Sequence, residues 1–347
     1  MRVVQCRVSR YDIRMLPKSP NEILKKAKTS ALLVSNLINI RYLTGLRLSA
    51  GLLLIKPRSI TLFVDGRYKE VSEQEARKGI KVQDIEKIER VFKSVKECGF
   101  ESDNVTVSRL KQWKKKFKNT KFIQTSGVIE AFRRSKGSDE IKAFRRAQRI
   151  THELMRRIPL ALKSKVTERG LAFKLINWAQ ELGADEHSFD PIVAFGKHSS
   201  HPHHKPTDAK LKKGDIVQID TGVRFDGYCA DQSKVFFTGE KTSEQGKVLD
   251  AVAAAKSEAT AEIASGISTH ALDRIARKIL KEHGFEKFFP HSLGHGLGLE
   301  VHEGITLSQK VDSKDLLMHE IITIEPGVYL PGKFGIRLED EIIVLGK

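Results

Sequence analysis

The stretch VQIDTGVRFDGYCADQSKVFF, residues 217–237, decides the fold of the larger part of this 347-residue chain. Two runs rich in β-branched and aromatic residues flank Asp226-Gly227, a pattern typical of a two-residue β-hairpin. With that turn, Gly222 faces Asp231, and Asp220 lies on the same face, diagonal to Asp231. Diagonal neighbours lie about 7–8 Å apart, so the two carboxylates could hold a pair of divalent ions about 3.5–4 Å apart.

The alternative is that Asp220 and Asp231 are solvated acids on the polar face of a half-exposed hairpin. Two aspartates at this spacing do not distinguish the two interpretations. Other segments of the chain therefore have to decide whether the hairpin carries a metal site.

A glycine-rich segment supplies two histidines. SLGHGLGLEVHEG, residues 292–304, places His295 between two glycines, where the backbone can approach closely, and His302 follows seven residues later. Imidazole between glycines is well placed to reach a metal or a substrate.

Two further segments carry buried acids. ITIEPGVYLPG, residues 322–332, puts Glu325 at the end of a β-branched run, and GIRLEDEIIV, residues 335–344, predicts one strand with Glu339 inside it. An acid among apolar residues is costly unless it is paired or bound to a metal. Four carboxylates and one imidazole form an oxygen-rich set that suits Mn²⁺ and tolerates Co²⁺, Fe²⁺ or Zn²⁺.

The words IDTG, GYCAD, GHGLGLEVHE, TIEPGVY and GIRLED, in this order, resemble the metallopeptidases of the creatinase, prolidase and methionine aminopeptidase superfamily, which have the pita-bread fold. The resemblance covers about residues 138–347. ALLVSNLINIRYLTG (31–45) and FVDGRY (63–68) are similar to the N-terminal domain of Xaa-Pro aminopeptidases and prolidases. Methionine aminopeptidases lack that domain, so the resemblance favours proline-specific enzymes.

The resemblance implies a site with two divalent ions. It implies that Asp231 and Glu339 bridge the ions and that Glu325 also shuttles a proton to the leaving nitrogen. The implied metal ligands are Asp220, Asp231, His295, Glu325 and Glu339.

The resemblance also implies catalytic residues that bind no metal. His203, in FGKHSSHPHHKP (195–206), matches the Pro-His position and would donate a hydrogen bond to the developing oxyanion. His302 would contact the substrate backbone, and Arg337 a peptide carbonyl or a terminal carboxylate. Spacing alone does not show which histidine of this segment points inward: His198, His201, His203 or His204.

Two departures from the family pattern bear on the substrate. Ser233-Lys234 replaces the common Thr-Arg after the second aspartate, and the proline often found after His-Glu is missing at Gly304-Ile305. We expect Lys234 to leave a point charge beside the site where a bidentate arginine could stand.

The segment SKGS at 135–138 predicts a domain boundary, because Ser138 followed by two acids is a helix-start signature. We expect an α/β domain over 1–135 and an α+β pita-bread catalytic domain over 136–347. The smaller domain should have strands at 31–35, 51–56 and 59–65 and helices at 67–79 and 85–99. The larger should have helices from 138, 167–183, 243–266 and 269–284, and strands at 215–219, 227–238, 319–325 and 335–344.

The net charge of +18 is confined to the smaller domain, since residues 1–136 hold 31 Lys and Arg against 13 Asp and Glu, whereas residues 137–347 hold 30 of each. The densest cluster, residues 111–121, lacks a platform of aromatics for bases, so nucleic acid is not an expected partner. The chain shows no signal-peptide pattern and no membrane span. Three scattered cysteines fit a reducing cytoplasm.

The sequence thus predicts a cytoplasmic, dinuclear Xaa-Pro aminopeptidase, whose substrates are peptides with proline in the second position. A homodimer is expected because family members are often dimers or tetramers. Two alternatives remain: an Xaa-Pro dipeptidase with the same site, and a non-catalytic scaffold or nucleic-acid binder on the same fold.

Overall fold

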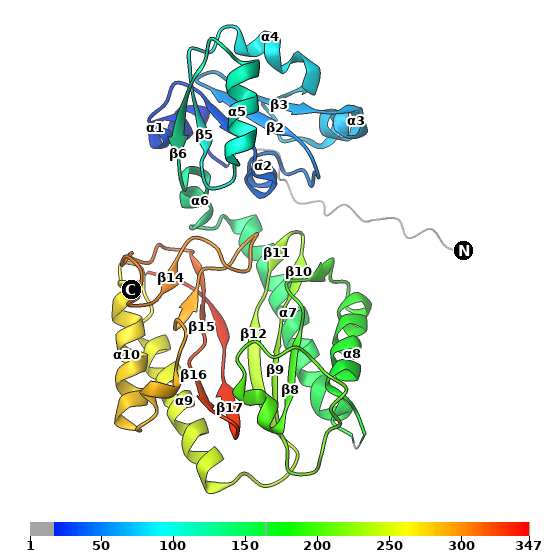
Figure 1. Ribbon diagram of the computed structural model, residues 1–347, viewed down its shortest axis with the longest axis vertical. Coiled ribbons are helices and arrows are strands. Elements are labelled where there is room, and N and C mark those ends of the chain that lie inside the picture. Colours follow the sequence, from blue (N-terminus) through cyan, green and yellow to red (C-terminus); the bar gives the residue numbers. More distant parts are fainter. Residues whose placement is uncertain (1–16, 164, 347) are drawn as a thin grey trace, which may run out of the picture. The chain divides into compact units, whose positions relative to one another are not determined.

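The computed structural model describes residues 17–163 and 165–346 (Figure 1). The first 16 residues, with Cys6 and the segment considered for a signal peptide, lie outside the described residues. The chain divides into two compact units between Arg133 and Arg134. None of the helices within the described ranges is long and apolar enough to cross a membrane.

The first unit is a mixed six-stranded sheet with helices packed around it (Figure 1), in the strand order β4-β3-β2-β1-β5-β6. The strands are β1 (Leu32–Val34), β2 (Leu52–Lys56), β3 (Ser59–Val64), β4 (Ile80–Asp84), β5 (Glu97–Glu101) and β6 (Lys121–Thr125). The helices are α1 (Pro20–Ala27), α2 (Leu37–Thr44), α3 (Gly66–Glu75), the 3₁₀ turn η1 (Ile85–Lys87), α4 (Ile88–Phe92), α5 (Val107–Lys116) and α6 (Val128–Arg133).

The helix expected over 85–99 was wrong in its second half. The helical part ends at Phe92, and Gly99 lies inside β5, which pairs in parallel with β1 on one side and β6 on the other. A Cβ at Gly99 would lie only 3.0–3.1 Å from side-chain atoms of Thr29, Leu32 and Thr125. The glycine therefore serves close packing inside the sheet, and the strand pairing outweighs the helical pattern of a short segment.

The second unit contains two helix-covered halves (Figure 1). In one, α7 (Ser138–Ala161) and α8 (Glu168–Glu181) pack on the sheet β12-β9-β8, and in the other, α9 (Ser243–Ala261) and α10 (Thr269–Glu282) pack on the C-terminal strands. All four helices were expected, and Thr167 caps α8 as predicted. The first-half strands are β7 (Glu186–His187), β8 (Ile192–Phe195), β9 (Ile216–Thr221), β10 (Val223–Phe225), β11 (Tyr228–Cys229) and β12 (Gln232–Phe237).

The remaining elements follow the long helices or lie in loops. They are the 3₁₀ turns η2 (Gly196–Ser200) and η3 (Glu286–Phe288) and the strands β13 (Gly294–His295), β14 (Thr306–Leu307), β15 (Ile321–Ile324), β16 (Gly327–Leu330), β17 (Phe334–Arg337) and β18 (Asp340–Ile343). Five strands of this unit were not expected from the sequence: β7, β8, β13, β14 and β16. β16 begins just after Pro326, where the apolar run had been expected to stop.

The hairpin at 217–237 has the predicted register. Phe225 pairs with Tyr228 across the Asp226-Gly227 turn, and Ser233 pairs with Asp220 further along. The same register on both sides of the break between β11 and β12 puts Asp231 opposite Gly222. The two aspartates are therefore diagonal neighbours on one face, as expected.

The strand expected over 335–344 was wrong as a single element, because Leu338 and Glu339 interrupt it between β17 and β18. β17 pairs with β16 and β18 pairs with β15, in one continuous register that places Glu339 opposite Glu325. The Glu339 N–H leaves the strand pairing and donates to the Ser233 carbonyl at 3.0 Å. The interruption thus joins the C-terminal hairpin to the hairpin at 217–237.

Gly222 is where these hairpins allow least room. A Cβ there would lie 1.8 Å from the Ala230 carbonyl oxygen, whereas a Cβ at Gly246, inside α9, would meet nothing within 4 Å. We expect Gly222→Ala to lower the free energy of unfolding by about 2–3 kcal/mol through overpacking. Gly246→Ala, the matched control, should raise it by about 0.5–1 kcal/mol. Urea titrations of both variants check this, and equal stabilities would contradict it.

Candidate metal and peptidase site

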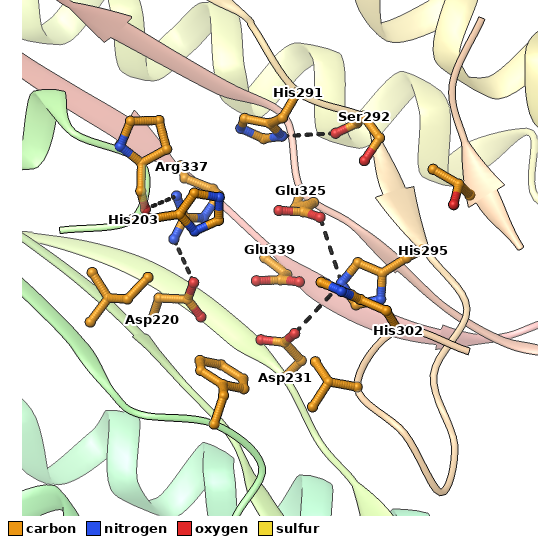
Figure 2. Close-up of a pocket in the computed structure, with 15 residues that line it drawn as sticks. His203, Asp220, Asp231, His291, Ser292, His295, His302, Glu325, Arg337 and Glu339 are labelled. Atoms are coloured by element: carbon orange, nitrogen blue, oxygen red, sulfur yellow. Dashed lines mark hydrogen bonds and ion pairs between the residues drawn. The ribbon is translucent and has the colours of Figure 1, made fainter. Parts of the chain in front are cut away.

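The eight residues to which the resemblance gives a metal-binding or catalytic role all line one pocket of about 570 Å³ in the second unit (Figure 2). Asp220 and Asp231 come from the first hairpin, whereas the other expected ligands come from the C-terminal half. The pocket lining is Phe189, Ile192, Pro202, His203, Asp220, Asp231, His291, Ser292, His295, Val301, His302, Thr306, Glu325, Arg337 and Glu339.

Asp231, His295 and Glu339 form the centre of the group, with one donor atom of each lying within 4.8 Å of the others. His295 Nε2 lies 3.7 Å from both Asp231 Oδ2 and Glu325 Oε1. Asp231 and Glu339 are only 5% and 2% exposed, yet each keeps a buried oxygen without a hydrogen-bond partner in the described part of the chain, as does Asp220. Buried carboxylate oxygens without donors are costly, so this arrangement suits cations.

The electrostatics of the group point the same way. Burial, and then the neighbouring carboxylates, hold the pKa of Asp231 and of Glu339 well above the usual range. Burial raises the pKa of Glu325 to about 8, against the lowering effect of Arg337. Removing protons from all of these acids requires nearby positive charge. An oxygen-rich set with one imidazole fits hard or borderline divalent ions.

His295 has the protonation state that a metal ligand would need. Burial, and then the neighbouring His302, lower its pKa to about 3. Its Nδ1 lies 3.1 Å from the Gly296 carbonyl, so we assign the proton to Nδ1. The lone pair of Nε2 then faces Asp231 and Glu325, as a metal-binding histidine requires.

Arg337 directs its donors into the protein. Its guanidinium donates to Asp220 Oδ2, to the Tyr329 hydroxyl at 2.7 Å and to Ser233 Oγ at 2.8 Å. A longer bond of 3.3 Å reaches the Pro202 carbonyl. One N–H of Nη2 takes part in none of these bonds.

Glu341 was not found from the sequence. It is buried, accepts a 2.6 Å bond from the Asp231 N–H and a 3.1 Å bond from Gln148 Nε2, and burial raises its pKa to about 7. It fixes the backbone that carries Asp231. Its spacing of two residues from Glu339 could have identified it, because alternate residues of an extended chain share a face.

Lys234 does not lie beside the site, so that expectation was wrong. It pairs with Ile219 of β9, one residue out of step with Ser233, and therefore faces α7. There burial first, and then the charge of Lys234, lower the pKa of His152. Strand alternation, which the sequence already contained, places it on the far face.

The histidine-rich loop sends its side chains in different directions. His203 lines the pocket, His198 and His204 contact Glu168, and His201 is exposed. Cys229 is a buried thiol, whose Sγ lies 3.3 Å from Arg224 Nε.

The fold and the donor set can now be compared with known proteins. The model of metallopeptidase family M24 matches residues 142–345, and that of the creatinase/prolidase N-terminal domain matches residues 19–135. The chain belongs to metallopeptidase family M24. It is therefore a hydrolase of a metal-dependent family, and the expected pita-bread fold with a creatinase-type N-terminal domain is confirmed.

Three solved structures show the same two-domain fold. An Xaa-Pro dipeptidase from Bacillus anthracis is 30% identical with a TM-score of 0.89, and 94% of each chain is covered. A prolidase from Pyrococcus horikoshii is 32% identical with a TM-score of 0.88, covering 94% of this chain and 95% of its own. An X-Pro aminopeptidase from Thermotoga maritima is 31% identical with a TM-score of 0.85, covering 93% and 95%.

The buried acids predict how the metal-free protein responds to pH. An unfolded glutamate titrates near 4.5, whereas Glu325 titrates near 8, so near neutral pH the folded chain holds a proton that the unfolded chain has released. The stabilisation is complete below the lower value and is lost as the pH rises through the higher one. Above pH 7 the buried His295 is neutral when folded and largely neutral when unfolded, so it adds little slope.

We therefore expect the Tm of chelator-treated protein to fall between about pH 7 and pH 8.5. The fall should be shallower in Glu325→Gln, which cannot titrate. Added Mn²⁺ should raise the Tm more at the higher pH, since the ligands must lose protons to bind it. Differential scanning calorimetry measures all three, and a slope unchanged in Glu325→Gln would contradict the assignment.

Proposed function

We propose that the protein is an Xaa-Pro aminopeptidase that works with two divalent ions and releases the N-terminal residue from peptides with proline in the second position. The observation that carries this proposal is the group of buried acids with open oxygens around His295. The names of the related solved structures, both aminopeptidases and dipeptidases of Xaa-Pro substrates, support the substrate class.

Two bridging carboxylates explain the arrangement. Asp231 and Glu339 stand in the middle of the group, with Asp220 on one side and His295 and Glu325 on the other (Figure 2). In our proposal Asp231 and Glu339 would be shared by both ions, Asp220 would complete one ligand set, and His295 with Glu325 would complete the other. When bound, such ions polarise the scissile carbonyl and lower the pKa of an attacking water.

The chain's own groups supply the remaining chemistry. Glu325, whose Oε1 lies 3.7 Å from His295 Nε2 in this pocket, is assigned to accept a proton and pass it to the leaving nitrogen. His203 and His302 line the same pocket and are assigned to the oxyanion and to the substrate backbone. Arg337 orients Asp220 through the bond to Oδ2, and its remaining Nη2 N–H is assigned to a peptide carbonyl of the substrate.

The preference for an aminopeptidase rests on charge. Of the described side chains that line the pocket, only Arg337 is permanently positive, and most of its donors are occupied within the protein. A dipeptidase must bind the carboxylate of a free proline, for which a bidentate guanidinium is the best partner. Few N–H donors of Arg337 therefore remain to bind that carboxylate.

Three finer assignments complete the proposal. We expect Mn²⁺ to be the working ion, because oxygen donors predominate in the site. Residence in a reducing cytoplasm fits Cys98 and Cys229 as free thiols. Assembly into a homodimer is the third expectation, and size-exclusion chromatography with light scattering measures it.

Asp231→Ala should remove metal binding and activity together, because a bridging carboxylate serves both ions. Metal content measured by mass spectrometry should fall from two ions per chain, and hydrolysis of an Xaa-Pro-Xaa peptide should fall to background. Asp340→Ala is the matched control, since this acid is half exposed and binds Lys256. Two ions retained by Asp231→Ala would contradict the bridging role.

A set of three substrates tests the aminopeptidase assignment. We expect kcat/KM for Xaa-Pro-Xaa to exceed that for Xaa-Pro by about tenfold, equal to 1.4 kcal/mol. The dipeptide amide, which differs from the dipeptide mainly in charge, should be cut at least as well as the acid. A clear preference for the free dipeptide over both its amide and the tripeptide would identify a dipeptidase.

A further inference from the structure

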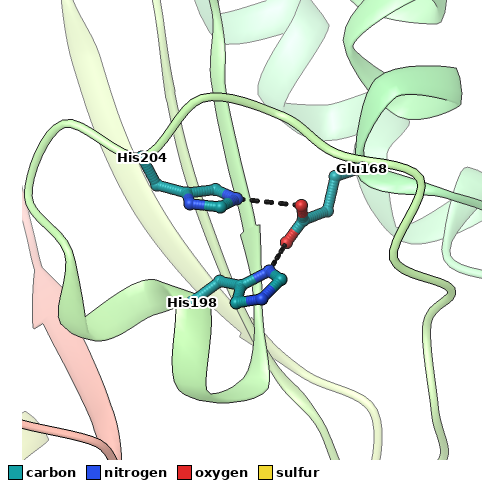
Figure 3. A group of neighbouring side chains, drawn as sticks. All are labelled: Glu168, His198 and His204. Atoms are coloured by element: carbon teal, nitrogen blue, oxygen red, sulfur yellow. Dashed lines mark hydrogen bonds and ion pairs between the residues drawn. The ribbon is translucent and has the colours of Figure 1, made fainter.

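A second group of polar side chains lies outside the pocket, at the start of α8 (Figure 3). The Glu168 carboxylate is fully buried and accepts five hydrogen bonds. Oε1 accepts from the Phe195 N–H at 2.8 Å and from His198 Nδ1 at 2.7 Å. Oε2 accepts from His204 Nε2 at 2.9 Å, from the Thr207 N–H at 2.9 Å and from Thr207 Oγ at 2.6 Å.

This group differs from the pocket in its balance of donors and acceptors. A carboxylate offers about four lone-pair positions, and five donors already occupy those of Glu168. Although Glu168, His198 and His204 are residue types that bind metals and lie close together, no oxygen of Glu168 is left open for a cation. Burial disfavours the charged carboxylate, but the bonds from Thr207 and His204 outweigh it and lower the pKa to about 2.

All five donors belong to one segment, from the end of β8 through η2 to Thr207. This is the loop that carries His203 into the pocket. Ser199 Oγ, in the same loop, accepts a 2.9 Å bond from the Gly335 N–H of β17. The loop is thus tied to α8 on one side and to the strand of Arg337 on the other.

His203 lies between two residues of the loop that are hydrogen-bonded to the rest of the unit. The preceding residue, Pro202, accepts a bond from Arg337, and the following residue, His204, donates to Glu168. His203 itself is exposed on the pocket surface. Its position therefore depends on its two neighbours in the chain.

We propose that Glu168 is a positioning residue: through His198, His204 and Thr207 it holds the loop that presents His203 to the substrate. The inference rests on the catalytic role of His203 in the proposed function. Glu168 touches neither substrate nor metal ligands in this arrangement, so its loss should leave the metal content unchanged.

A double-mutant cycle tests the proposal in the Mn²⁺-loaded, full-length protein. Glu168→Gln keeps the size of the side chain but offers one acceptor oxygen instead of two. We expect it to lower kcat on an Xaa-Pro-Xaa peptide by about 10- to 100-fold, the cost of a misplaced catalytic group. Combined with His203→Ala, it should cause little loss beyond that of His203→Ala alone, because both act through one side chain.

A matched pair of variants guards against misfolding of Glu168→Gln. His204→Phe keeps a ring but cannot donate to Glu168, and should also lower kcat. His201→Phe makes the same substitution at an exposed position of the same loop and should leave kcat unchanged. Hydrogen exchange should become faster over residues 196–207 in Glu168→Gln and in His204→Phe, and not in His201→Phe.

The outcomes separate this inference from the proposed function. Losses that multiply in the double variant, full kcat in both Glu168→Gln and His204→Phe, or unchanged exchange in the loop would overturn the positioning role alone. If His203→Ala keeps full kcat, His203 leaves the mechanism and both assignments fall. If Glu168→Gln loses its metal ions, Glu168 supports the metal site instead, and the inference is wrong.

Discussion

Four carboxylates around one buried pocket are the constraint on which the rest of the structure depends. Asp231 and Glu339 are almost inaccessible to solvent, and burial and mutual repulsion raise the pKa of both. Within residues 17–163 and 165–346, Asp220 is the only one of the four with a cationic side chain, Arg337, directly bonded to it. Such a group is unfavourable for folding unless protons or cations compensate its charge. In our proposal, bound metal ions supply this compensation at neutral pH.

The surrounding framework holds these acids in place through the backbone. Glu341 accepts the Asp231 N–H, and the Ser233 carbonyl accepts the Glu339 N–H, so each bridging candidate is anchored to the opposite hairpin. Gln218 continues the connection by accepting the Arg337 N–H at 2.8 Å. Ligands supported in this way keep their geometry when the charge between them changes.

The sequence predicted what depends on local chemistry. The Asp226-Gly227 turn determines the register of its hairpin, and with it the common face of Asp220 and Asp231. The prediction of one helix over 85–99 failed because β5 pairs with two strands, β1 and β6, that the helical pattern does not reveal. The prediction of one strand over 335–344 failed because the Glu339 N–H bonds to Ser233 of another hairpin. Glu168 could not be foreseen, since all of its partners follow it by 27 to 39 residues. The position of Lys234, by contrast, followed from strand alternation and could have been predicted.

The central claim is that the buried acids hold two divalent ions that share Asp231 and Glu339. Anomalous diffraction from a Mn²⁺-loaded crystal, collected near the manganese absorption edge, tests it most directly. The account predicts two peaks about 3.5–4 Å apart, one beside Asp220 and the other beside His295 and Glu325, with Asp231 and Glu339 contacting both. A single peak, or two peaks with neither carboxylate shared, would contradict it.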